Sequence, residues 1–89
     1  MNPDRQLKEI FSNPHRLAIV KSLKGGSKTL KELRIELGIT KQLLGWHIVG
    51  LEALGVIEVK RHGIHRRASL SKEKITQLLR YLKGVLNDS

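Results

Sequence analysis

Two predicted helices with clear start and stop signals follow each other between Thr29 and Gly55. These signals limit what the chain can fold into. Thr29 has a side-chain oxygen suited to a helix amino end, and a glutamate follows three residues later, as in a capping box. Gly38 suits the end of this helix, and Thr40 can cap a second helix that ends before Gly55. A helix, a turn containing glycine and a second helix predict a helix-turn-helix.

The second of these helices, expected over about 40–54, has two faces of different character. Leu44, Ile48 and Leu51 recur at the i, i+4, i+7 spacing that places side chains on one buried face. The opposite face has no carboxylate in its first two turns, which indicates a surface that contacts another molecule. Its residues are Gln42, Trp46, Val49 and Ala53, with Lys41 and Gly45 at the edge.

Two earlier start signals predict two further helices in the first part of the chain. Asn2 and Asn13 are each followed by a proline, the pattern of a capping side chain and a first-turn proline. Apolar residues follow each signal at helical spacing, and the second of these helices is expected to stop at Gly25 and Gly26. The sequence therefore predicts four helices before Gly55.

The remainder of the chain predicts a β-hairpin and a last helix. Apolar and β-branched residues over about 56–70 flank Gly63, which suits the tip of a hairpin. Ser71 can cap a helix over about 71–87, where apolar residues recur in steps of three and four. The expected fold is mainly α with a small β-hairpin wing, a winged helix-turn-helix that fills residues 1–89 as a single domain.

The charge of the chain points to a polyanionic partner. Lys and Arg number 17 against 8 Asp and Glu, which gives a formal net charge of +9. Such a chain repels itself in the free state, and a polyanionic partner relieves that repulsion. Nucleic acid is the first candidate, an anionic membrane surface the second and an acidic protein the third. The absence of cysteine excludes disulfides and thiolate metal sites, and no apolar run suits a signal peptide or a membrane span. We expect a cytoplasmic protein without a cofactor.

Several short motifs occur in a fixed order between about residue 13 and residue 86. They are Asn13-Pro14-His15-Arg16-Leu17, Leu30-x-x-Leu33, Thr40, Trp46-His47-Ile48-x-x-Leu51-x-x-Leu54-Gly55-Val56-Ile57 and the wing from Arg61-x-Gly63 to Ser69-Leu70. In their order and spacing these motifs resemble those of the ArsR type of winged helix-turn-helix transcription repressor, a bacterial and archaeal family. The resemblance implies a homodimer that holds two recognition helices in successive major grooves, with the first and last helices at the dimer interface.

Two sets of site residues follow. We expect the recognition helix and the wing to contact double-stranded DNA through Thr40, Lys41, Gln42, Gly45, Trp46, Lys60, Arg61, His62, His65, Arg66 and Arg67. The expected dimer interface consists of Leu7, Ile10, Phe11, Ile75, Leu78, Leu79, Leu82, Val85 and Leu86. The family's usual metal sites have no counterpart, because the third helix has no thiol and the last helix has no histidine and only Glu73 as a carboxylate. No metal is expected.

Several of these residues have a second interpretation. The wing cations could instead discourage strand pairing at an exposed edge. Trp46 could press on a thymine methyl or a sugar–phosphate surface, or it could pack against the wing or a dimer partner. Gln42 suits adenine and Lys41 suits guanine or phosphate, unless both are simply solvated. Gly45 would allow close approach to the DNA backbone, whereas Gly50 would allow tight packing against another helix.

The histidines do not predict a metal or catalytic site. His47 lies at the edge of the buried stripe, where we expect a core histidine with its hydrogen bonds satisfied. His62 and His65 lack further ligands nearby, so we treat them as wing residues. We find no carboxylate pair, no nucleophile with a base and no glycine-rich phosphate loop, and we therefore expect no enzyme activity.

The sequence thus predicts a sequence-specific DNA-binding transcription regulator that acts as a homodimer. The alternative from another class is a winged-helix protein-interaction module without direct DNA readout, which would bind its partner independently of salt. An RNA-binding winged helix is less well supported, because a single tryptophan offers little base stacking. A regulator controlled by an effector, and a monomer whose last helix folds back on its own core, are also compatible with the sequence.

Overall fold

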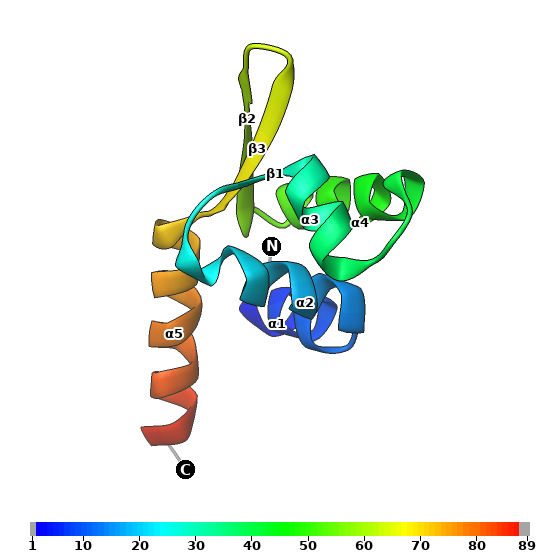
Figure 1. The fold of residues 1–89 in the computed structure, drawn as a ribbon. Coiled ribbons are helices and arrows are strands. Elements are labelled where there is room, and N and C mark those ends of the chain that lie inside the picture. Colours follow the sequence, from blue (N-terminus) through cyan, green and yellow to red (C-terminus); the bar gives the residue numbers. More distant parts are fainter. Residues whose placement is uncertain (1, 88–89) are drawn as a thin grey trace.

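The first four α-helices pack together below a narrow sheet, and the last helix extends away from them in the direction opposite to the wing (Figure 1). The computed structural model describes residues 2–87, so the ends of the expected domain, residues 1, 88 and 89, lie outside the described residues. The elements are α1 (Pro3–Phe11), α2 (Pro14–Ser22), the 3-10 helix η1 (Leu23–Gly25), β1 (Lys28–Thr29), α3 (Leu30–Leu37), α4 (Lys41–Ala53), β2 (Ile57–His62), β3 (His65–Leu70) and α5 (Lys72–Asn87).

The predicted helix starts are confirmed by their caps. Asn2 and Asn13 each accept hydrogen bonds from backbone N–H groups of the following turn. Thr29 and Glu32 form the reciprocal capping box at the start of α3, with both hydrogen bonds between 2.9 and 3.0 Å. The Thr40 hydroxyl accepts a hydrogen bond from a backbone N–H of the first turn of α4 at 3.1 Å. Each cap satisfies a backbone donor that the helix itself leaves unpaired.

The predicted helix ends are confirmed for α3 and α4 and need a correction for α2. Gly38 and Gly55 have φ angles of 65° and 76°, the left-handed conformation that a residue without a Cβ adopts most easily. Helix α2 ends earlier than expected, at Ser22, and the chain continues as the tighter turn η1 before Gly26. The Gly25–Gly26 pair therefore marks the end of this extension instead of the end of the α-helix.

The sheet has a third strand that the sequence did not predict. Strands β2 and β3 form the expected antiparallel hairpin, and β1 pairs with the other edge of β3, in the order β1-β3-β2. Strand β1 is only two residues long, and its second residue, Thr29, is also the cap of α3. The Thr29↔Arg67 pairing therefore ties the start of the helix-turn-helix to the base of the wing.

The core is aliphatic and lies where α1 to α4, the base of the hairpin and the start of α5 meet. The buried face predicted for α4 is confirmed, because Leu44, Ile48 and Leu51 are all buried. The buried apolar residues are Ile10, Ile19, Leu23, Leu33, Leu44, Ile48, Leu51, Leu54, Val56, Ile57, Ala68 and Leu78. Within residues 2–87, no helix is long and apolar enough to span a bilayer.

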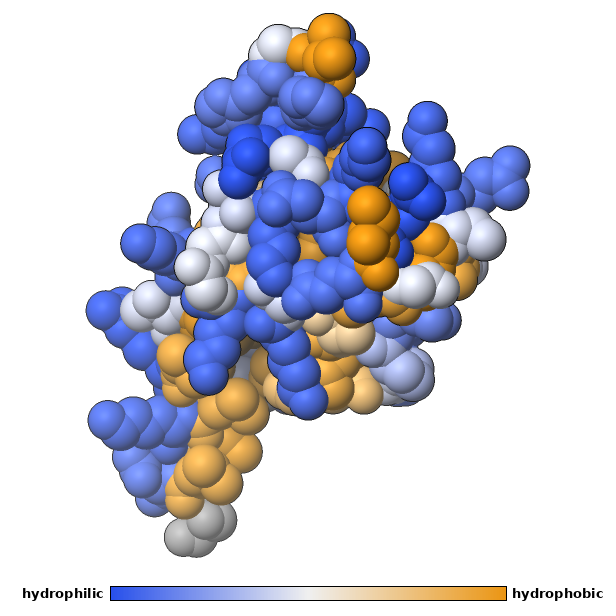
Figure 2. Space-filling view, in the orientation of Figure 1, coloured by the Kyte–Doolittle hydropathy of each residue, from blue (hydrophilic) through white to orange (hydrophobic). Residues whose placement is uncertain are grey.

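Helix α5 is anchored to the body through its first half. Leu78 is buried in the core, Ile75 packs against it, and the Tyr81 hydroxyl donates a hydrogen bond to the Asp4 carboxylate of α1. The rest of the apolar stripe, from Leu79 onward, is exposed, and Figure 2 shows a hydrophobic strip along the projecting helix. The exposed apolar residues of the stripe are Leu79, Leu82, Val85 and Leu86. The last helix thus covers its own core with only part of its apolar face.

Candidate nucleic-acid interface

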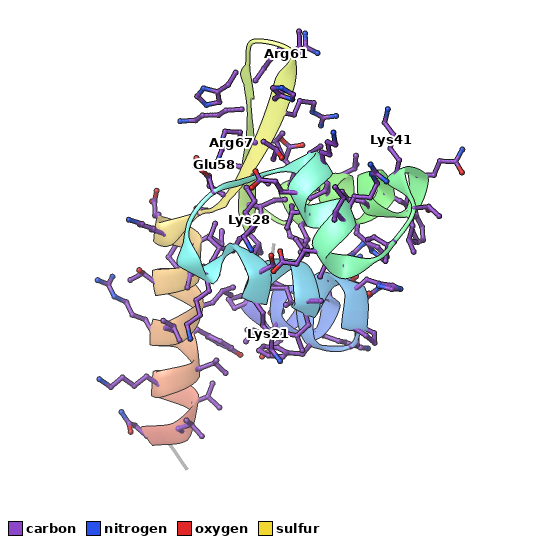
Figure 3. The ribbon with its side chains drawn as sticks, viewed as in Figure 1. Lys21, Lys28, Lys41, Glu58, Arg61 and Arg67 are labelled. Atoms are coloured by element: carbon purple, nitrogen blue, oxygen red, sulfur yellow. The ribbon has the colours of Figure 1, made fainter. Side chains whose placement is uncertain are left out.

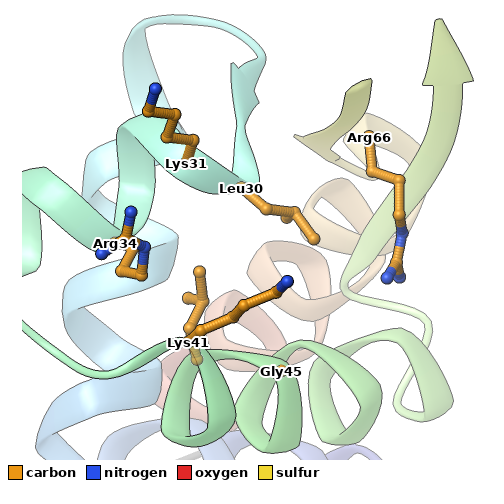
Figure 4. A pocket seen from close by; sticks show the side chains of 7 residues that line it. Leu30, Lys31, Arg34, Lys41, Gly45 and Arg66 are labelled. Carbon is orange, nitrogen blue, oxygen red and sulfur yellow. The ribbon is translucent and has the colours of Figure 1, made fainter. Parts of the chain in front are cut away.

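A groove with four cations and no carboxylate in its lining lies between α3, α4 and β3 (Figure 4). Its volume is about 300 Å³. Leu30 and Leu44 supply its apolar part, and Gly45 leaves one side without a side chain. The cations that line it, which we call the groove cations, are Lys31, Arg34, Lys41 and Arg66. A concave surface whose charged side chains are all positive attracts an anion that reaches several of them at once.

Three separate elements place the groove cations. Lys31 and Arg34 lie one turn apart on α3, while Lys41 belongs to the first turn of α4, directly after its Thr40 cap. Arg66 comes from β3, and Figure 4 shows its side chain and that of Lys41 in the space between β3 and α4. Arg66 joins the three cations of the helix-turn-helix only because the wing packs beside it.

The groove continues toward the tip of the wing. A second hollow of about 290 Å³ shares Lys31, Lys41 and Arg66 with the first and adds Ile64 and His65. Ile64 is 93% exposed and forms the hydrophobic tip of the otherwise hydrophilic wing (Figure 2). Together the two hollows form one basic groove that runs from α4 to the hairpin turn.

Like charges face each other across the hairpin. Arg61 pairs with Arg66, and Lys60 pairs with Arg67, in the antiparallel register of β2 and β3. Directly opposed like charges destabilise a strand pair, so folding alone does not favour this arrangement. A bound polyanion would remove the repulsion, which supports the nucleic-acid interpretation of the wing over a simple protection of a strand edge.

Arg67 differs from the other wing cations because it is engaged within the protein. Its Nε donates a hydrogen bond to the Ser27 hydroxyl at 3.3 Å, and its Nη2 donates one to the Ser27 carbonyl oxygen at 3.2 Å. The residue is half-buried, whereas Arg61 and Arg66 are exposed. Arg67 therefore holds the base of the wing against the segment before β1.

Trp46 and Gln42 lie on the outward face of α4, as the helical spacing predicted. The indole is 71% exposed, so it does not pack against the wing of its own chain. Gln42 is exposed one turn earlier, and Thr40 uses its hydroxyl to cap the helix. The outward face of α4 thus presents both a hydrogen-bonding amide and a large apolar ring to solvent.

The two glycines inside α4 have different surroundings. A Cβ at Gly50 would lie only 2.4 Å from Nη2 of Arg16, a residue of α2, so the predicted tight packing against another helix is confirmed. A Cβ at Gly45 would meet no atom of another element within 4 Å. Packing inside the protein therefore accounts for Gly50 but leaves Gly45 free for an approaching partner.

Replacing Gly45 with alanine is expected to stabilise the free protein and weaken its binding to DNA. Alanine in an open helical position gains about 0.5–1 kcal/mol over glycine. The new methyl group would lie in the groove, where it would hold a DNA backbone away. Urea unfolding and a duplex titration on the same variant measure both effects. Gly50→Ala is the control for stability, because its Cβ must displace Arg16. If Gly45→Ala kept the DNA affinity of the wild type, the DNA backbone would not approach Gly45 closely.

His47 is buried as predicted, but the prediction that its hydrogen bonds are satisfied is wrong for Nδ1. The side chain is 2% exposed, and Nδ1 has no hydrogen-bond partner, nor does the buried Nε of Arg16 beside it. Arg16 instead directs Nη1 to the Glu9 carboxylate at 3.1 Å. The imidazole of His15 stacks at a tilt with a ring-centroid distance of 5.4 Å. Burial lowers the pKa of His47, and electrostatic interactions with His15 and Arg16 lower it further.

The free energy of unfolding is expected to fall as the pH drops below the ordinary histidine value of 6.5. The unfolded chain takes up a proton near that pH, whereas the folded chain resists it until a lower pH, so acid favours unfolding. Urea unfolding between pH 5 and 8 measures the effect. His47→Leu should remove this part of the pH dependence, whereas His62→Gln, at an exposed position, should keep it. Equal pH profiles for wild type and His47→Leu would contradict the account.

The structure also places residues that the sequence did not assign to the site. Lys31 and Arg34 line the basic groove, although the sequence suggested only that their helix lacks a thiol. Their i, i+3 spacing on the outer side of α3 was the available signal. In the part of the chain that the structure describes, no group of three histidine, cysteine, aspartate or glutamate side chains is positioned to hold a metal ion.

Comparisons with known proteins agree with this geometry. A family model described as "Helix-turn-helix domain" matches residues 11–60. Among curated protein sequences, none matches the chain.

Solved structures share the fold over nearly the whole chain. An ArsR family transcriptional regulator is similar with a TM-score of 0.82 and 24% identity over 99% of both chains. The transcriptional repressor BigR from Xylella fastidiosa has a TM-score of 0.74 and 27% identity, over 91% of this chain and 83% of its own. A homodimeric winged helix-turn-helix DNA-binding domain from Mycobacterium bovis has a TM-score of 0.75 and 17% identity, over 97% of this chain and 80% of its own.

These matches confirm the family resemblance and the fold class predicted from the sequence. The family model covers α2 to α4 and the start of the hairpin, and the solved structures extend the likeness to the wing and α5. The chain belongs to the helix-turn-helix domain family and has the winged-helix fold of the ArsR family of transcription regulators, which are DNA-binding proteins and not enzymes.

Proposed function

We propose that this protein is a cytoplasmic, sequence-specific transcription repressor that binds double-stranded DNA as a homodimer. Helix α4 enters the major groove with Lys41, Gln42 and Trp46, and the wing lies on the flanking backbone or minor groove. The observation that carries the proposal is the basic groove, whose lining has four cations and no carboxylate.

The groove cations are available for phosphate. Within residues 2–87, the ion pairs are Arg16–Glu9 and Lys28–Glu36, and neither involves a groove cation. Arg61 is exposed on the same side of the hairpin as Arg66, because residues opposed in an antiparallel register share a face. Phosphate contacts from these side chains would fix the orientation of α4 on the duplex, while base contacts from α4 would supply sequence specificity.

The apolar stripe of α5 supports the homodimer. Ile10 and Leu78 lie in the protomer's own core, and Leu7 and Ile75 pack against it, so the proposed interface is formed mainly by the exposed members of the predicted set. These are Phe11 of α1 and Leu79, Leu82, Val85 and Leu86 of α5. A two-fold axis beside α5 would present two copies of α4 to half-sites about one helical turn apart.

The two neighbouring wing arginines give a matched test of the proposal. Arg66→Ala should weaken binding to every duplex sequence and reduce the salt slope by about one unit for each bound protomer, because each protomer loses one phosphate contact. Arg67→Ala should leave the salt slope closer to that of the wild type and lower stability, because Arg67 is hydrogen-bonded to Ser27. Fluorescence anisotropy at several salt concentrations measures both slopes. An Arg66→Ala variant with wild-type affinity and slope would overturn the wing assignment.

The exposed Trp46 also suits the alternative function, a protein-interaction module. Exposed tryptophans are enriched among the residues that dominate protein–protein interfaces. This alternative gives no role to the groove cations, and it requires partner binding that depends little on salt. A duplex titration therefore separates the two functions directly.

A further inference from the structure

An apolar stripe runs along the outward face of α4 beside the basic groove. Gln42, Trp46, Val49 and Ala53 follow each other at steps of three and four residues, so their side chains lie on one line of the helix. Trp46 is 71% exposed and Val49 is 62% exposed. Lys31 and Arg34 of α3 and Arg66 of the wing line the basic groove beside the first turns of this helix.

Phosphate contact does not explain these two side chains. The isopropyl group of Val49 has no hydrogen-bond donor, and Trp46 has a single N–H on a large apolar ring. Exposed apolar surface beside the basic groove would be left in contact with water if α4 only followed the DNA backbone. The stripe therefore requires an apolar group on the partner, at a place where the neighbouring groove cations also find anions.

The thymine methyl is the apolar group that the major groove of DNA offers. Each base pair presents donors and acceptors there, and thymine alone adds a C5-methyl group. The amide of Gln42 can pair with the adenine of such a base pair through two hydrogen bonds. We infer, on the basis of the proposed DNA-binding function, that Trp46 and Val49 read thymine methyl groups, and that each half-site has thymines opposite them.

The test removes the methyl groups from the DNA instead of from the protein. A duplex is first selected from a random library by the full-length protein, and each thymine is then replaced by deoxyuridine, which lacks only the methyl. We expect a loss of about 4-fold in affinity for each methyl contacted, the equivalent of about 0.8 kcal/mol per buried carbon. Replacement at thymines outside the half-sites should have no effect.

Protein variants complete a double-mutant cycle. The Trp46→Ala and Val49→Ala variants should each lose the discrimination at one thymine. At the thymine that the replaced residue contacts, the variant should bind the thymine duplex and the deoxyuridine duplex with equal affinity. Ile35→Ala removes a comparably exposed apolar side chain from α3 and should retain the full discrimination. Circular dichroism confirms that each variant is folded.

The outcomes distinguish this inference from the function on which it rests. Selection of no duplex at all would overturn the proposed function. Salt-dependent duplex binding that is indifferent to deoxyuridine, or a selected half-site without thymine, would overturn the inference and leave the proposed function intact. Discrimination that persists in both Trp46→Ala and Val49→Ala would also overturn it.

Discussion

Replacing Lys31, Arg34, Lys41 and Arg66 together with alanine is expected to weaken duplex binding about 10³-fold at roughly 0.15 M salt for each protomer that contacts the DNA. Each phosphate neutralised by a cation contributes about 0.9 to the dependence of log K on log salt, so the slope should fall by about 3.6 per protomer. The effect is large because the four side chains line one groove and can engage the same duplex.

A variant of equal net charge controls for non-specific attraction. Lys8, Lys21, Arg80 and Lys83 are exposed, and they belong to α1, α2 and α5 instead of the helix-turn-helix and the wing. Lys21, for example, lies on the far side of the helical body from the wing (Figure 3). Replacing these four with alanine should leave most of the affinity and slope unchanged. Equal losses in the two variants would mean that net charge alone, and not the basic groove, attracts DNA.

Leu79→Asp is expected to convert the dimer to a monomer and to reduce affinity for a two-half-site duplex by roughly 10²–10⁴-fold, the range gained by linking two binding modules. Leu79 is 60% exposed in the protomer, so the fold itself should lose little stability. In a two-fold interface the substitution would place two carboxylates in the apolar contact, where burial of unpaired charge is costly.

Light scattering and a titration against duplexes with one or two half-sites measure the two consequences. Gln77→Asp adds the same charge at an exposed position on another side of α5 and should remain dimeric. The affinity of Leu79→Asp for a single half-site should be close to that of the wild type. A Leu79→Asp variant that stays dimeric would place the interface elsewhere.

The parts of the fold that depend on neighbouring residues could be predicted from the sequence. The Thr29–Glu32 capping box and the Thr40 cap join residues three apart, and Gly38 and Gly55 act through their own backbone conformation. Such signals depend little on the rest of the chain. They placed α3 and α4 correctly, and the periodicity of α4 identified its buried face.

The parts that depend on distant residues could not be predicted in this way. The hydrogen bonds between Arg67 and Ser27 join positions 40 residues apart, and nothing local distinguishes Arg67 from Arg66. Strand β1 is too short for a period to show. The unpaired Nδ1 of His47 results from the packing of α2 against α4.

The same limit explains how much of the candidate site was anticipated. The sequence identified Lys41 and Arg66 as separate contacts, one on the recognition helix and one on the wing. It did not identify the groove between them, because Lys31 and Arg34 join it only through the packing of α3 beside β3. Helix periodicity assigns a residue to a face, and the fold decides which faces meet.

The most direct test of the central claim, that the basic groove binds duplex DNA, is an anisotropy titration of the full-length protein against random duplex DNA at several salt concentrations. Light scattering on the same sample gives the oligomeric state. We expect a dimer and a log–log salt slope steeper than about −3, since the four groove cations alone should contribute about 3.6. A monomer with negligible binding and a flat salt dependence would contradict the account and favour the protein-interaction module.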